Sequence, residues 1–123
     1  MIDPNFILLY VADPRVSADF YSDLLGDPPI EASPTFAMFA LESGVMLGLW
    51  SRAHVEPAAS ITGGGGELGF SVKDNARVDE IYFDWRERGL PIVQSPTQMD
   101  FGYTFVAVDP DGHRLRVFAP SGN

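Results

Sequence analysis

Residues 6–13 read FILLYVAD, and 61 positions later residues 67–74 read ELGFSVKD. Each stretch is a short apolar or alternating run, typical of a β-strand, and each closes on the pattern Val-x-Asp. The aspartate then stands where the N-cap of a following helix is expected. Self-similarity at a fixed spacing predicts that the chain contains two copies of one supersecondary unit.

A helical pattern follows each of these strands. The first helix is predicted to begin at Asp13-Pro14 and to end at Gly26, and the second to begin at Asp74 or Asn75 and to end at Gly89. Apolar side chains recur in each at the spacing of one helix face. They are Phe20, Tyr21, Leu24 and Leu25 in the first helix, and Val78, Ile81, Tyr82 and Trp85 in the second.

The end of each unit repeats as well, because residues 44–50 match residues 112–118, 68 positions later. Both are strands entered through a turn that contains glycine. Between helix and last strand each unit has two more strand candidates, at residues 30–32 and 35–42 and at residues 92–99 and 103–109. We therefore expect an α+β fold of two tandem βαβββ modules that form curled mixed sheets around a cavity.

This organisation predicts a single domain over residues 1–123. Module one covers about residues 5–51, a linker about residues 52–66, and module two about residues 67–120. The linker contains four consecutive glycines, residues 63–66, which favour a flexible connection. A phosphate-binding loop is the alternative, but the lysine of a P-loop is missing and a strand follows instead of a helix.

Composition narrows the function classes. The 123 residues are 46% hydrophobic and 20% charged, with a net charge of −9, which disfavours nucleic acid and anionic membranes as partners. The chain has no cysteine, so disulfides, thiolate metal sites and cysteine nucleophiles are excluded. No signal peptide or run of about 20 apolar residues is visible, and we expect a cytoplasmic protein.

Several motifs carry a family resemblance. They are residues 11–13, 19–21 and 24–26 in the first unit, and the turn at residues 108–113 in the second. With the paired modules, they resemble the glyoxalase/bleomycin-resistance/extradiol dioxygenase superfamily, which has the vicinal oxygen chelate fold. Within this superfamily, the phenazine-antibiotic resistance proteins are most similar to the chain in two stretches, residues 39–50 and residues 101–117. The resemblance implies that the chain sequesters griseoluteate-type phenazines without transforming them.

Enzymes of this superfamily hold a divalent metal through four positions, one on the first and one on the last strand of each module. The resemblance assigns these positions to Phe6, Gly48, Glu67 and Arg116. Phenylalanine and glycine side chains cannot coordinate, a guanidinium repels a cation, and one carboxylate is too few for a catalytic metal. We therefore expect neither a metal nor another cofactor, and no catalytic residue.

Other catalytic arrangements have little support. The two histidines, His54 in the linker and His113 after a turn, belong to no motif with metal-ligand spacing. Composition does not exclude a Ser-His-Asp triad, but the chain has no Gly-x-Ser-x-Gly motif. Two interpretations of Glu67 and Arg116 stay open. They form an ion pair across the seam between modules, or Arg116 meets a carboxylate or carbonyl group of the ligand.

Strand alternation assigns side chains to faces. The faces that pack under the helices are uniformly apolar, whereas the cavity faces mix aromatic side chains, glycines and charges, as in a binding pocket. Trp50 is the strongest candidate because its flat ring can stack on a fused aromatic ligand. Gly48 and Gly69 are expected to leave room for that ligand. The other candidate ligand-binding residues are Tyr10, Phe36, Met38, Glu67, Phe101, Tyr103, Phe105, Arg116 and Phe118.

The sequence therefore favours a non-catalytic protein that binds and sequesters a planar aromatic antibiotic or metabolite, phenazine-like, in the manner of an antibiotic-resistance protein. The alternative is a metal-dependent lyase or dioxygenase of the same fold. A third possibility is an interaction module whose cavity is filled by its own side chains. The resemblance and the open sheet edges also predict a homodimer.

Overall fold

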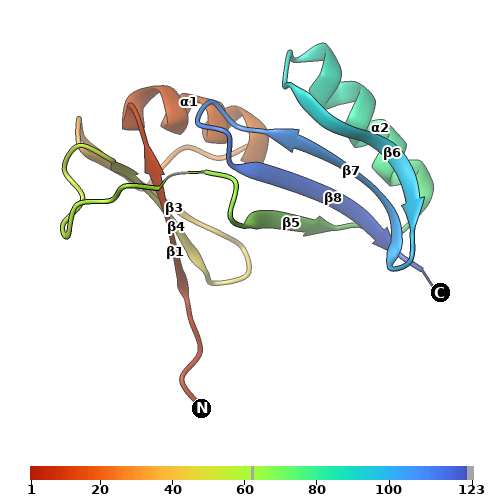
Figure 1. Cartoon of the computed structure of the whole chain (residues 1–123), viewed down its shortest axis with the longest axis horizontal. Coiled ribbons are helices and arrows are strands. Elements are labelled where there is room, and N and C mark those ends of the chain that lie inside the picture. Colours follow the sequence, from red (N-terminus) through yellow and green to blue (C-terminus); the bar gives the residue numbers. More distant parts are fainter. Residues whose placement is uncertain (62, 122–123) are drawn as a thin grey trace. The chain divides into compact units, whose positions relative to one another are not determined.

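A computed structural model describes residues 1–61 and 63–121 of the chain (Figure 1). The chain divides into two compact units, Met1–Gly63 and Gly64–Asn123. This division falls inside the segment expected as a linker, residues 52–66, of which Thr62 lies outside the described residues. The elements of the first unit are β1 (Phe6–Val11), α1 (Pro14–Leu25), β2 (Glu31–Ala32), β3 (Phe36–Ala40) and β4 (Met46–Ser51). Those of the second are β5 (Glu67–Ser71), α2 (Asn75–Glu87), β6 (Ile92–Met99), β7 (Gly102–Val108) and β8 (Arg114–Pro120).

The two units have the same topology. The sheet of unit 1 has the order β1-β4-β3-β2, and that of unit 2 has the order β5-β8-β7-β6. In each sheet the first strand pairs in parallel with the last, and the remaining pairs are antiparallel. The predicted α+β fold of two tandem βαβββ modules with mixed sheets is confirmed.

Both helices begin where their capping residues predict. The carboxylate of Asp13 accepts a hydrogen bond from the backbone N–H of Arg15 at 3.0 Å, and Asp74 caps α2 through the backbone N–H of Arg77 at 2.9 Å. Helix α1 ends at Leu25 and is capped by Gly26, whose φ of 82° is readily adopted by glycine. Neither described helix is long and apolar enough to cross a membrane.

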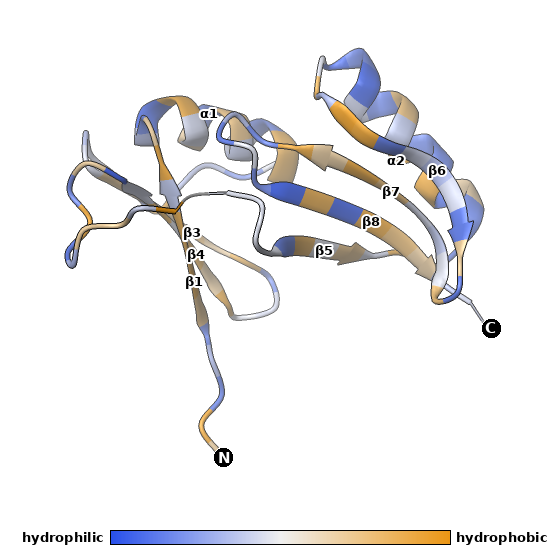
Figure 2. Ribbon diagram, viewed as in Figure 1, coloured by the Kyte–Doolittle hydropathy of each residue, from blue (hydrophilic) through white to orange (hydrophobic). Residues whose placement is uncertain are grey.

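Each helix covers one face of its own sheet, and we call the other face the open face. Helix α1 packs on β3 and β4, and α2 packs on β6, β7 and β8. The side chains of Leu47, Leu49, Leu115 and Val117 are buried on the helix-covered faces, as the alternation predicts. Figure 2 shows this alternation along β8, where hydrophilic and hydrophobic residues follow one another.

The strands differ from the sequence prediction mainly at their ends. β3 is shorter than residues 35–42, because the chain turns through Gly44, where the N–H of Gly44 donates to the carbonyl of Leu41 at 3.0 Å. β7 begins at Gly102, one residue earlier than predicted. Any side chain at Gly102 would overlap the carbonyl of Ala119 on β8, so only glycine fits this position.

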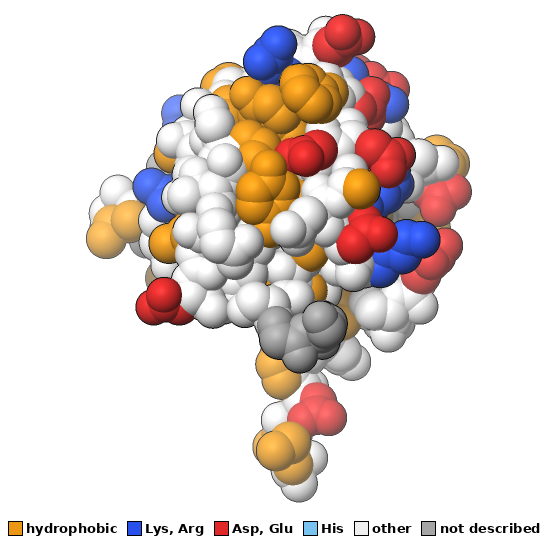
Figure 3. Space-filling model, turned by 90° about the vertical axis from the view of Figure 1, so that its right-hand side faces the viewer, with side chains coloured by type: hydrophobic (Ala, Val, Ile, Leu, Met, Phe, Trp, Pro, Cys, Tyr) orange, Lys and Arg blue, Asp and Glu red, His pale blue; other side chains and the backbone are white. Residues whose placement is uncertain are grey.

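The side of unit 2 that carries α2 and β6 shows hydrophobic side chains among charged ones (Figure 3). Phe83 of α2 and Val93 of β6 are exposed. The guanidinium carbon of Arg86 lies 5.6 Å from the ring centroid of Tyr82 and 5.7 Å from that of Phe83. This side therefore carries an exposed apolar surface that the core of unit 2 does not use.

Candidate ligand-binding site

The open face of unit 1 is hollowed by an apolar pocket of about 450 Å³. Its lining comes from three neighbouring strands, with Phe6 and Leu8 on β1, Phe36 on β3 and Trp50 on β4. All four side chains are hydrophobic, and three are aromatic. The volume falls in the range of small-molecule sites, and an apolar aromatic lining is typical of them, although this pocket is wide open to solvent.

Trp50 is held in place by its neighbours on the sheet. The register pairs it with Tyr10 on the β1 side and with Phe36 on the β3 side. The ring of Tyr10 meets it edge to face, with the centroids 6.4 Å apart and the planes at 78°. Trp50 therefore lines the pocket as expected, with Tyr10 as its supporting contact.

Gly48 differs from the expectation that it leaves room for a ligand. A Cβ atom there would lie 2.8 Å from Leu8 Cδ2, 2.9 Å from Phe6 Cε1 and 3.0 Å from Phe36 Cζ. The space above this glycine is therefore filled by side chains of the chain itself, and those side chains line the pocket. Met38 pairs with Gly48 on β3 and is half-buried, but it is not among the lining residues.

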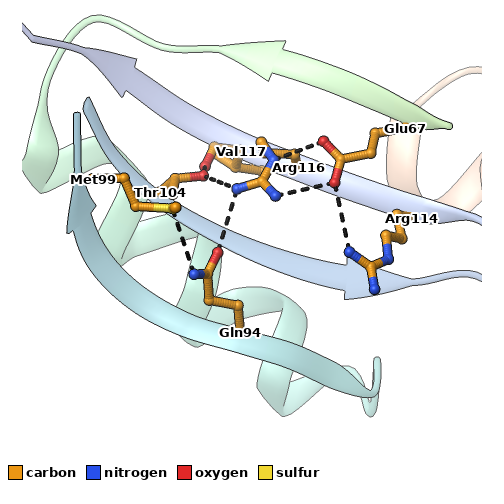
Figure 4. Close-up of polar contacts among 7 residues, drawn as sticks. All are labelled: Glu67, Gln94, Met99, Thr104, Arg114, Arg116 and Val117. Atoms are coloured by element: carbon orange, nitrogen blue, oxygen red, sulfur yellow. Dashed lines mark hydrogen bonds and ion pairs between the residues drawn. The ribbon is translucent and has the colours of Figure 1, made fainter. Parts of the chain in front are cut away.

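The open face of unit 2 is polar and is organised around Arg116 (Figure 4). Its Nε donates to Glu67 Oε1 at 2.7 Å and its Nη2 donates to Glu67 Oε2 at 3.0 Å, which is a bidentate ion pair. The ion pair, one of the two interpretations that the sequence left open, is present. Its expected position across the module seam is wrong, because both residues lie on neighbouring strands of one sheet, β5 and β8.

Two further side chains hold the same guanidinium. Arg116 Nη1 donates to Gln94 Oε1 at 3.3 Å and to Thr104 Oγ1 at 3.2 Å. The Thr104 hydroxyl donates to the carbonyl of Val117 at 2.9 Å, so its lone pairs are free to accept from Arg116. Sequence reasoning missed both residues. A threonine in the apolar run of residues 103–108 was the available signal for Thr104.

This network favours the ionised form of the Glu67 carboxylate. The hydrogen bonds from Arg116 and its positive charge, with a smaller contribution from the charge of Arg114, hold the pKa of Glu67 below its usual value of 4.5. Arg114 Nη1 lies 4.0 Å from Glu67 Oε2. Two arginines therefore share one carboxylate on this face.

Two aromatic rings adjoin the network. The guanidinium carbon of Arg116 lies 5.6 Å from the ring centroid of Phe101, within the range of a cation–π interaction. Phe101 in turn meets Phe118 edge to face, with centroids 6.1 Å apart. The structure thus brings together four of the predicted residues, namely Glu67, Phe101, Arg116 and Phe118.

The expected position of Tyr103 and Phe105 in the cavity wall is wrong. The Tyr103 hydroxyl donates to Asp79 Oδ1 of α2 at 2.7 Å, and this hydrogen bond raises the pKa of Tyr103. Phe105 is fully buried, with its ring centroid 5.4 Å from that of Tyr82 and 5.5 Å from that of Trp85. Side chains alternate between the two faces of β7 from Gly102 onward, so those of Tyr103 and Phe105 both point toward the helix. Phe101 lies before the strand and is not part of this alternation.

The four positions that the resemblance assigns to a metal do not fit one. Phe6 and Gly48 offer no side-chain ligand atom, and both carboxylate oxygens of Glu67 accept hydrogen bonds from Arg116. In the part of the chain that the structure describes, no group of three or more His, Cys, Asp or Glu residues could hold a metal ion. His54 instead shares a hydrogen bond of 3.0 Å between its Nδ1 and Ser51 Oγ.

The paired modules and the two open faces define a class of protein. The family model of the Glyoxalase/Bleomycin resistance protein/Dioxygenase superfamily matches residues 4–117, and the chain belongs to this superfamily. It is also 30% identical to the phenazine antibiotic resistance protein EhpR of Enterobacter agglomerans, over 94% of this chain and 91% of EhpR.

Solved structures share the fold of this chain. A protein from Agrobacterium tumefaciens, solved by NMR in solution, is 55% identical, with a TM-score of 0.91 over 99% of this chain and 100% of that one. A glyoxalase/bleomycin resistance protein/dioxygenase from Nocardioides has a TM-score of 0.84 at 22% identity, over 100% of this chain and 87% of that one. At that identity the second likeness shows the shared fold alone.

Proposed function

We propose that this protein binds and sequesters a planar aromatic antibiotic or metabolite of the phenazine kind, without a metal, and so protects the cell that makes it. The observation that carries the proposal is the 450 Å³ apolar pocket lined by Phe6, Leu8, Phe36 and Trp50. The 30% identity to a phenazine antibiotic resistance protein over nearly the whole chain supports the choice of ligand class.

The chemistry of the pocket suits a flat, apolar ligand. Burying the faces of a fused ring against Trp50 and Phe36 removes apolar surface from water, at about 25 cal/mol per Å². Offset or edge-to-face contact with aromatic rings adds roughly 0.5–1.5 kcal/mol for each ring pair. Such binding forms no covalent bond and needs no proton transfer. The protein acts by lowering the free concentration of the ligand.

The alternative activity, a metal-dependent lyase or dioxygenase, has less support. Those reactions need protein ligands for the metal, and the positions that would supply them hold Phe6, Gly48, Glu67 and Arg116. Glu67 carries the one coordinating group among these four, and its carboxylate is engaged by Arg116. A metal-independent binding role therefore agrees better with the described side chains.

The proposal includes a homodimer, located in the cytoplasm as the sequence predicts. Strand β1 is an edge strand, and its large side chains Phe6 and Leu8 are 42% and 45% exposed. An edge strand with exposed apolar side chains favours covering by another chain. A second copy of the same chain would supply that cover in a two-fold arrangement.

Tryptophan fluorescence tests the binding proposal directly. The chain has two tryptophans, Trp50 in the pocket and Trp85 buried between Phe70 and Phe105. Titration with a panel of phenazines and other polycyclic drugs should quench the wild-type emission in a saturable way. A Trp50→Phe variant, which keeps only Trp85, should lose most of the quenching. Absence of saturable quenching and of binding heat across the panel would refute the proposal.

A further inference from the structure

Gly48 lies inside β4, where a glycine weakens a strand, and its φ lies outside the region that favours glycine. The backbone therefore does not require this residue, whereas the packing does. The atoms nearest to a Cβ built at Gly48 belong to Leu8, Phe6 and Phe36, and all three lie closer than ordinary van der Waals contact. These are three of the four side chains that line the pocket of unit 1.

The strand register explains why three side chains meet over one residue. Leu8 on β1 pairs directly with Gly48. Phe6 on β1 pairs two positions before Gly48 and Phe36 on β3 pairs two positions after it, so both rings reach across it diagonally. Positions two apart on a strand share a face, which places all of these side chains on the open face. The absence of a side chain at Gly48 therefore lets the lining side chains lie close to the sheet.

A methyl group at Gly48 would move the lining side chains and leave the sheet in place. The nearest atoms are the far ends of side chains, and Phe6 and Leu8 are exposed, so both can turn outward into solvent. At Gly102 the obstacle is instead the backbone carbonyl of Ala119, which cannot turn away. Substitution at Gly48 therefore makes the pocket shallower without breaking the strand pairing.

The depth of this pocket matters because its lining is hydrophobic. Among the described side chains that line it, the indole N–H of Trp50 is the one hydrogen-bond donor. The wide opening leaves polar substituents of a bound ligand in water. Affinity should therefore rise with the apolar ring surface that the ligand buries, and the depth of the pocket limits that surface.

We propose that Gly48 is a positioning residue that sets the depth of the unit 1 pocket through Phe6, Leu8 and Phe36. It thereby makes the site select three fused rings over two. The inference rests on the proposed function and deepens it, because the size of the ring system, and not its polar groups, then determines which planar aromatic compounds bind.

Tryptophan fluorescence titration with phenazine and quinoxaline, corrected for absorption by the probe, tests this role. The two neutral probes share a pyrazine ring and differ by one fused benzene ring. Wild-type protein should bind phenazine about ten-fold more tightly than quinoxaline, because the third ring buries more apolar surface. Gly48→Ala should weaken phenazine binding about ten-fold and quinoxaline binding by less than about three-fold.

The matched control is Gly65→Ala, which adds the same methyl group where it meets no described atom within 4 Å. It should bind both probes like wild type. The Tm of Gly48→Ala should stay within about 4 °C of wild type, since the side chains that move are free to turn into solvent.

A double-mutant cycle tests whether Gly48 acts through the lining side chains. Leu8→Ala removes the nearest atom and leaves space into which the ring of Phe6 can turn. In the Leu8→Ala background, Gly48→Ala should therefore weaken phenazine binding by less than about three-fold, because the two effects are coupled.

The outcomes separate this inference from the proposed function. Equal wild-type affinity for the two probes, an equal or absent loss for both in Gly48→Ala, an undiminished loss in the Leu8→Ala background, or a Gly48→Ala protein that does not fold would overturn the role of Gly48. Each of these would leave the proposed function standing. Failure of both probes to bind wild-type protein would overturn the inference and also the phenazine ligand class.

Discussion

The guanidinium of Arg116 and the carboxylate of Glu67 form a bidentate ion pair, with N–O distances of 2.7 and 3.0 Å, inside the sheet of unit 2. Both residues occupy positions that the family resemblance assigns to metal ligands. A guanidinium thus takes the place of a cation beside the one carboxylate of the set, and also binds Gln94 and Thr104.

Removing the carboxylate should destabilise the fold. Glu67→Gln leaves a half-buried guanidinium without its charge partner, and we expect a loss of about 1–2 kcal/mol in the free energy of unfolding, after allowance for solvent screening. Urea denaturation monitored by circular dichroism gives the value. Glu80→Gln is the control, because its pair with Arg77 spans 3.6 Å with both side chains more than half exposed, and it should cost about 0.5 kcal/mol or less. Equal effects of the two variants would contradict this role of Glu67.

The same ion pair should make stability depend on pH in a defined direction. Arg116 holds the pKa of Glu67 in the folded protein below its usual 4.5, so the unfolded chain takes up the proton first as pH falls. The stabilisation is therefore fully present above about pH 4.5 and is lost as pH falls through the lower pKa of the folded state. In urea titrations, the stability difference between wild type and Glu67→Gln should be constant at neutral pH and should shrink below pH 4.5. A stability difference that grows as pH falls would contradict this direction of the pH dependence.

Much of the fold was predictable because its signals are local or repeated. Asp13, Pro14 and Gly26 mark the bounds of α1 through capping chemistry, and the repeat predicted two modules of the same topology. In the first and last strands of each module, the alternation of side chains predicted which residues face the helix and which lie on the open face. Tyr103 was misplaced because the segment around it runs from a turn into a strand at Gly102, and the register begins only there.

The rest of the site depends on contacts that a single sequence does not reveal. Gln94 reaches Arg116 from a strand with register shifts, so counting along β6 would not have placed it. Gly48 and Gly69 looked alike in the sequence. Their difference arises because the large side chains of Phe6 and Leu8 close over Gly48, whereas Phe118 alone approaches Gly69 among the described residues.

The protein should hold no stoichiometric metal. The side chains at Phe6, Gly48 and Arg116 cannot coordinate, and the Glu67 carboxylate is occupied. Elemental analysis of untagged, dialysed protein should find well under one equivalent of zinc, nickel, iron or manganese. Treatment with a chelator should leave ligand affinity unchanged. One equivalent of metal retained through dialysis would refute metal independence.

The protein should be a dimer in solution at micromolar concentration. Exposed apolar side chains on the edge strand β1 favour burial against a second copy. Light scattering coupled to size-exclusion chromatography should give twice the chain mass of 13.5 kDa. Phe6→Ser should shift this equilibrium toward the monomer, whereas Val16→Ser, at an exposed position of α1, should not. A wild-type mass of one chain would contradict the dimer.

We propose that Trp50 forms the surface on which the aromatic ligand stacks, and calorimetric titration of Trp50→Ala tests this role most directly. Loss of such an aromatic group costs about 2 kcal/mol or more, which at 1.4 kcal/mol per ten-fold change corresponds to roughly thirty-fold weaker binding of a phenazine identified in the fluorescence panel. Leu47→Ala is the control for folding, because Leu47 is buried on the helix-covered face and should lose about 2–5 kcal/mol of stability. We expect Trp50→Ala to lose less stability than Leu47→Ala and to bind the ligand at least about thirty-fold more weakly than wild type. A folded Trp50→Ala protein that binds within about three-fold of wild type would contradict it.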